Sequence, residues 1–168
     1  MKKPIFAALA TAFLSAGTCY AQLPQAAAAG MRAKNLLEFH KAAVANPTNV
    51  LLLAVEIRSL FRSDGARYGA LNNGTAAKLG LFDNAPNGLS IVEVGPRASQ
   101  SSPHGYFFIA LKELSFKECA ALAGHSALQG NFVSVEVNGT PLAGFGPAAC
   151  KSQLPFQRGK NTITFISY

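Results

Sequence analysis

The sequence contains no tryptophan, only three cysteines and few charged residues, which make up 14% of its 168 positions. Hydrophobic residues make up 49%, and this balance excludes an intrinsically disordered chain. The formal net charge is +7, but lysine and arginine form no dense block, so we expect no specific nucleic-acid partner. Beyond residue 21, no apolar run approaches the roughly 20 residues that a membrane-spanning helix needs.

Patterns typical of catalytic and metal sites are also missing. The histidines, His40, His104 and His125, are far apart, and no two cysteines are separated by two residues, so we expect no metal site. Ser126 follows His125 but lies outside any Gly-x-Ser-x-Gly turn of the kind that holds a nucleophilic serine. We therefore expect neither an enzyme nor a cofactor. The alternative, a small periplasmic enzyme or inhibitor, would require a polar pocket around His104 or His125.

The first 21 residues have the features of a secretory signal peptide. Lys2 and Lys3 precede an apolar run over residues 5–16, and small residues at positions 19 and 21 fit a cleavage site after Ala21. The alternatives are an uncleaved N-terminal anchor and a lipoprotein modified at Cys19. Ala16 stands where a lipoprotein signal has leucine. The predicted location of the protein is therefore the periplasm or the cell exterior.

Cleavage after Ala21 would leave 147 residues, which is enough for one domain with its own core. We expect residues 22–48 to form a tail or a weak helix, and residues 49–168 to form the globular domain. Cys119 and Cys150 would then be the remaining cysteines, and in an exported chain they most simply form one disulfide. Such a bond would stabilise the fold by roughly 3–4 kcal/mol in the chain-entropy model. A metal pair and a catalytic thiol are the competing interpretations.

Hydrophobic periodicity predicts helices in the first half of the chain. The pattern is weak over residues 31–45, whereas residues 49–63 carry a broad apolar stripe that predicts a largely buried helix. A short helix is expected over residues 73–78, with Gly80 at its end. Another is expected over residues 115–124, where Ser115 and Glu118 form a capping box and Gly124 ends the helix.

The second half of the chain has the alternation of β-strands. Strands are predicted over residues 89–95 and 106–114, which form a hairpin, and over residues 161–168. Residues 131–137 also alternate, with Val133, Val135 and Val137 on one face, and Asn138-Gly139 predicts a tight turn. Helices and strands are segregated along the chain, so the expected class is α+β. It would comprise an antiparallel sheet of about four strands with the helix of residues 49–63 on one face.

Four segments in this order resemble the globular part of type IV pilins, in particular the type IVb group. They are IRSLFRSDGARYGALNN (57–73), SFKECAALAG (115–124), FVSVEVNGT (132–140) with AAC (148–150), and NTITFIS (161–167). In that family, a long helix containing arginine runs into a glycine-rich turn, and two cysteines in these positions bound a segment called the D-region. The resemblance implies the same disulfide, between Cys119 and Cys150. Residues 119–150 are called the D-region below.

The N-terminus departs from the pilin pattern. A pilin is cut after a glycine and then presents more than twenty hydrophobic residues, which anchor the subunit and later form the filament core. The residues after Gly30 include Arg32, Lys34 and Glu38, which are costly to bury in lipid, so this stretch is not expected to be an assembly helix.

The resemblance implies a pilin-like structural or accessory protein of a type IV pilus or a related secretion or conjugation system. Its partners would be other pilins or pilus assembly proteins, bound through its helix and the D-region. A secreted adhesin or ligand-binding module with a surface receptor is the alternative.

Overall fold

The structure, a computed structural model, describes residues 35–61, 67–82, 91–100, 103–128, 130–143, 149–152 and 161–168. The expected signal peptide, residues 1–21, lies outside these ranges, as do the first part of the expected tail and the end of the helix predicted to reach residue 63. The described helices and strands are, in chain order, α2 (Leu36–Ala45), α3 (Thr48–Phe61), α4 (Asn73–Lys78), β1 (Val92–Arg97), β2 (Tyr106–Leu114), α5 (Phe116–Ala123), a 3-10 turn (Ser126–Leu128), β3 (Ser134–Val137), β4 (Thr140–Pro141) and β5 (Asn161–Ser167).

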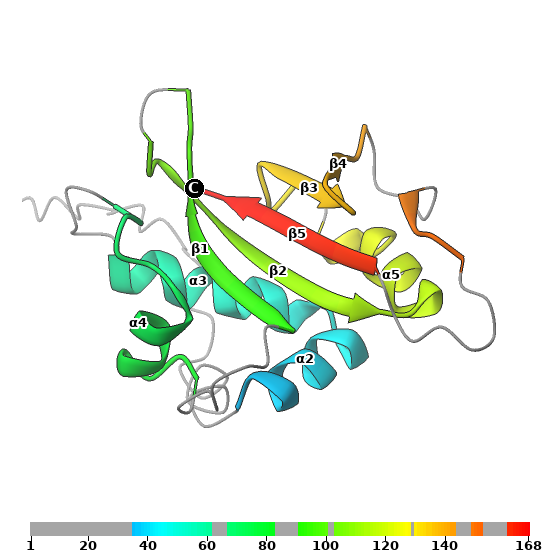
Figure 1. The fold of residues 1–168 in the computed structure, drawn as a ribbon, viewed down its shortest axis with the longest axis horizontal. Helices are drawn as coiled ribbons and strands as arrows, with labels where there is room; N and C mark the ends of the chain where they lie inside the picture. The colour runs from blue at the N-terminus through cyan, green and yellow to red at the C-terminus, as the bar shows by residue number, and fades with distance from the viewer. Residues whose placement is uncertain are drawn as a thin grey trace, which may run out of the picture.

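The strands form one antiparallel sheet of five strands in the order β1-β2-β5-β3-β4. The last long strand, β5, lies between β2 and β3, and α3 runs behind the sheet (Figure 1). The predicted α+β class, with a helix on an antiparallel sheet, is thus confirmed. The fifth strand is the two-residue β4, which is too short to be recognised by alternation.

Side chains near the helix starts account for where several helices begin. The Oδ1 atoms of Asn35 and Asn72 accept hydrogen bonds from the backbone N–H groups of Glu38 and Thr75, both at 2.9 Å. Ser115 and Glu118 form both bonds of the predicted capping box at the start of α5. Each cap satisfies backbone donors that the first helical turn leaves unpaired.

The hydrophobic core lies between the helices and the inner face of the sheet. Along β2, Phe107, Ile109 and Leu111 are fully buried, and Ile109 lies between Val94 of β1 and Phe165 of β5. The helix α3 contributes most of the apolar stripe predicted from its sequence, and α2 also packs into this core. Val55 and Leu60 of α3, which were expected to belong to this apolar surface, are exposed. The core residues contributed by α2 and α3 are Leu36, Phe39, Ala43, Val50, Leu53, Ala54, Ile57 and Phe61.

One predicted strand face is wrong at its beginning. Val133 was expected to lie on the same face as Val135 and Val137, but it is 46% exposed, whereas Phe132 is buried. The reason is that β3 begins only at Ser134. Side chains before Ser134 do not alternate between the two faces of the sheet as they would in a strand. Phe132 therefore points inwards, and its ring packs against the Phe165 ring at a centroid distance of 5.0 Å.

Candidate functional site

The D-region is closed by a disulfide between Cys119 on α5 and Cys150, with the two Cα atoms 6.0 Å apart. Both cysteines are buried. The capping box at Ser115 fixes the start of α5, and this places Cys119 on the buried side of the helix. The disulfide therefore joins a helix that packs against β2 and β5 to the segment that leads towards β5.

Two asparagines hold the same segment on either side of Cys150. The amide of Asn161 donates to the carbonyl oxygens of Lys151 (3.1 Å) and Leu114 (3.3 Å), and its Oδ1 accepts from the Lys151 N–H at 2.8 Å. Asn138 donates to the Ala149 carbonyl at 3.2 Å and to Asn161 Oδ1 at 3.0 Å. Asn161 is fully buried, so this network replaces the water that the backbone of residues 149–151 would otherwise require.

The hairpin of β3 and β4 forms the outer edge of the sheet within the D-region. Its turn is the predicted Asn138-Gly139, in which both residues have positive φ, 54° and 79°, as a two-residue type I′ turn requires. Pro141 in β4 and Pro96 in β1 place a residue without an N–H group on each edge strand. Proline on an edge disfavours the addition of a further strand. A partner of the D-region is therefore expected to contact side chains.

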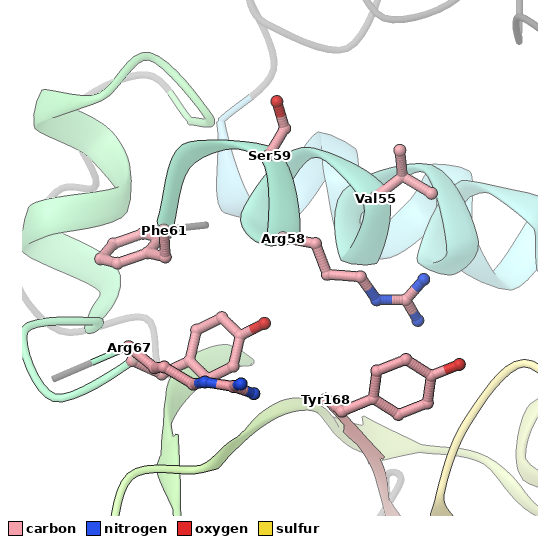
Figure 2. Close-up of a pocket in the computed structure, with 7 residues that line it drawn as sticks. Val55, Arg58, Ser59, Phe61, Arg67 and Tyr168 are labelled. Carbon is pink, nitrogen blue, oxygen red and sulfur yellow. The ribbon is translucent and has the colours of Figure 1, made fainter. Parts of the chain in front are cut away.

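A pocket with a volume of about 470 Å³ lies beside the D-region, between the last turns of α3 and the residue that follows β5 (Figure 2). This volume falls within the range of small-molecule sites. Its lining combines two arginines with aromatic, aliphatic and hydroxyl side chains: Val55, Arg58, Ser59, Phe61, Arg67, Tyr68 and Tyr168.

Arg58 connects α3, the D-region and the end of β5. Its Nη2 donates to the Ser167 hydroxyl at 2.6 Å and to the Asn131 carbonyl at 3.1 Å. Its Cζ lies 5.3 Å from the centroid of the Tyr168 ring, a cation–π distance. The guanidinium is therefore held in place by groups from two parts of the chain, the D-region and the end of β5.

Tyr68 forms the inner wall of the pocket. Its ring is buried against the rings of Phe107 and Phe61, at centroid distances of 4.7 and 6.2 Å. Burial raises the pKa of the Tyr68 hydroxyl above its ordinary value, although the positive charges of Arg58 and Arg67 act in the opposite direction. The hydroxyl thus stays protonated at neutral pH and can donate a hydrogen bond.

The residues discussed as candidate sites in the sequence have separate positions in the structure. Cys119 and Cys150 are joined as predicted. His40 lies against the Lys112 carbonyl, with its Nε2 at 2.8 Å, and neither His104 nor His125 lines the pocket. Within the described residues, no three His, Cys, Asp or Glu side chains form a metal-binding group. The pocket itself was not predicted, although the segment of residues 57–73 quoted for the pilin resemblance contains five of its residues.

A crystal structure of a type IVb pilin from Salmonella typhi resembles this chain, with a TM-score of 0.52 and 15% sequence identity. The match covers 69% of this chain and 92% of that pilin. The chain has a pilin-like fold. No family model matches the sequence, and no curated protein matches it.

The resemblance drawn from the sequence motifs is thus confirmed for the fold. In this pilin-like fold, the disulfide-closed D-region lies next to the pocket lined by Arg58 and Arg67, which is called the arginine pocket below. The two are neighbours because Arg58 donates a hydrogen bond to Asn131 of the D-region. Among the helices that the structure describes, none is long and apolar enough to cross a membrane.

Proposed function

We propose that this protein is an exported structural or accessory component of a type IV pilus or a related system, acting through contacts with other proteins. The observation that carries the proposal is the fold, which resembles that of a type IVb pilin over 92% of that pilin. Other pilins or pilus assembly proteins are the proposed partners. The proposed location is the periplasm or the cell exterior.

The D-region is the proposed contact surface. Its backbone is fastened by the disulfide and by the asparagine network, so its exposed side chains are held in a defined arrangement. Val133, 46% exposed, and the β4 edge provide an apolar and uncharged part of this surface. Interface cores are typically depleted of charged residues, which is consistent with this choice.

Site-specific crosslinking tests this surface. A photoreactive phenylalanine analogue placed at Val133 or Thr140, in the full chain produced in its native cell, should form crosslinks to pilus subunits or pilus assembly proteins. These are to be identified by mass spectrometry. The matched control is the same analogue at Leu79, which is 45% exposed and lies just after α4, outside the D-region. Crosslinks that are absent, or equally frequent from Leu79, would contradict the proposal.

Export makes a separate prediction about the covalent chain. The protein isolated from the cell envelope should have the mass of a chain beginning at Gln22, because signal peptidase would cut after Ala21. Iodoacetamide should add two carbamidomethyl groups after reduction and none before, since Cys119 and Cys150 are joined. A mass that retains Met1, or that begins at Met31, would instead indicate an anchor or a pilin-type cut.

The pocket supports a second candidate function, that of a secreted adhesin or ligand-binding module on the same fold. A structural subunit needs no cavity of about 470 Å³ lined by arginine and tyrosine. In this case, the Val133 and Thr140 variants would capture no pilus component, whereas the pocket would bind a ligand.

A further inference from the structure

The arginine pocket carries two positive charges, and its described lining includes no Asp or Glu side chain. Arg58 and Arg67 are its charged lining residues. The ion pairs of the described residues join Arg97 to Glu136 and Lys112 to Glu93, so neither pocket arginine takes part in one. Arg58 is half-buried, whereas Arg67 is exposed. Removing an arginine's charge from water is unfavourable unless an anion compensates it, and this cost applies to Arg58.

Arg58 is positioned before any ligand arrives. Two hydrogen bonds through Nη2 and the contact with the Tyr168 ring restrict its rotamers. Its buried Nε has no hydrogen-bond partner among the described residues, so the guanidinium is not saturated. A donor group that is already ordered loses little entropy when it binds an acceptor.

Arg67 adds its charge from the opposite side in an unfavourable backbone conformation. Its φ is 50°, in the left-handed region that favours glycine, and within the described part of the chain its side chain makes no hydrogen bond or ion pair. Figure 2 shows the Arg58 and Arg67 side chains extending towards Tyr168 from two different segments. Positive φ is uncommon at residues other than glycine and occurs preferentially at functional sites, which favours a binding role for Arg67.

The remaining walls select among anions. The rings of Phe61, Tyr68 and Tyr168 surround the charged groups, and Val55 adds an aliphatic wall. A compact anion such as phosphate would use the guanidiniums and leave these walls unused. We infer that the pocket binds a carboxylate attached to a planar or aliphatic apolar body, with the carboxylate oxygens on Arg58 and Arg67 and the body against the rings.

Calorimetric titration of the full chain with benzoate tests the inference. Benzoate should bind saturably at one site, with a Kd of roughly 1 mM as suits so small a ligand, whereas benzamide should bind at least about tenfold more weakly. Arg67→Gln should weaken benzoate binding about tenfold or more, because one charge-assisted hydrogen-bonding group is lost. Arg67→Lys should recover only part of that loss, since lysine lacks the planar fork.

Matched controls separate the pocket from general charge effects. Lys78→Gln removes one positive charge from the exposed end of α4 and should leave benzoate affinity unchanged. Asp64→Asn removes the acidic residue nearest to Arg67 in the sequence and should not abolish binding. Because Arg67 is exposed and forms no ion pair with a described residue, its variants should fold, and their unfolding midpoints provide the check. Arg58→Gln is a less suitable variant because it breaks two hydrogen bonds.

The source of the carboxylate is decided by a second titrant. Acetyl-Asp-Phe-amide presents the same chemistry as part of a peptide, and tighter binding than benzoate would assign the site to an acidic segment of a partner protein. Tighter binding of benzoate would assign it to a free acid. Phosphate binding as tightly as benzoate, or an equal benzoate affinity in Arg67→Gln, would overturn the inference, as would the absence of any binding. Benzoate binding is measured on the isolated protein, whereas crosslinking uses D-region positions outside the pocket. Either experiment can therefore fail without the other.

Discussion

Replacing both Cys119 and Cys150 with alanine should lower the free energy of unfolding by about 3–4 kcal/mol, because the bond closes a loop of roughly 30 residues in the unfolded chain. Alanine is preferred to serine, since both positions are buried and a hydroxyl there would need a new hydrogen-bond partner. For a domain of this size, the loss corresponds to a fall in Tm of roughly 10 °C. Urea and thermal unfolding of the two chains, followed by circular dichroism, measure it.

Reduction provides the internal control for this prediction. The wild-type protein should lose a similar amount of stability when a reductant is added, whereas the double-alanine protein should not respond. An unfolding midpoint of the wild type that is unaffected by reductant would contradict a disulfide in the native protein. Hydrogen exchange should also become faster at Ala149 and Lys151, which flank Cys150, if the bond holds this segment on the domain.

Replacing Asn161 with leucine should cost about 2–4 kcal/mol, because it removes several buried hydrogen bonds at once and leaves their partners without a substitute. The side chain is fully buried and bonds to both the N–H and the carbonyl of Lys151. Leucine is similar in size, so the loss reports the polar network more than a cavity. Asn161→Asp should be at least as damaging at neutral pH, because a carboxylate would face the carbonyl oxygens of Leu114 and Lys151.

The matched control is Asn131→Ala. Asn131 is exposed, and its side chain makes one hydrogen bond, to the Ala127 carbonyl at 3.0 Å. The contact of Arg58 with Asn131 uses the backbone carbonyl and survives the change. The expected loss is therefore under about 1 kcal/mol in the same denaturation assay. Equal losses in Asn131→Ala and Asn161→Leu would show that the buried network does not stabilise the fold as the geometry implies.

The two stabilising features act on the same few residues, so their effects should not be independent. The disulfide fixes Cys150, and the two asparagines fix the backbone on either side of it. Once one fastening is lost, the segment around Cys150 can move away, and the other then contributes less. Combining Asn161→Leu with the two alanine substitutions should therefore destabilise the protein by less than the sum of the separate losses.

Signals contained in a few adjacent residues were sufficient to predict several parts of the fold. The capping box of Ser115 and Glu118, the Asn138-Gly139 turn and the limits of β2 appear in the structure where the sequence placed them. In each case, the residues that determine the structure lie within one helical turn, one hairpin loop or one strand. The burial stripe of α3 was predictable for the same reason, because its period is that of the helix itself.

The strand order, the hydrogen-bond network of Asn161 and the arginine pocket were decided only by tertiary structure. β5 lies between β2 and β3, the Asn161 amide meets backbone groups near positions 114 and 151, and Tyr168 reaches Arg58 from the other end of the chain. These contacts join residues that are up to 110 positions apart in the sequence, so no local sequence pattern predicts them. The sequence by itself determined the helices, the turns and the pairing of the available cysteines. Helices and turns depend on the backbone conformation of neighbouring residues, and the few cysteines leave few possible pairs. The pocket exists because packing the sheet against α3 brings together side chains that local patterns leave unconnected.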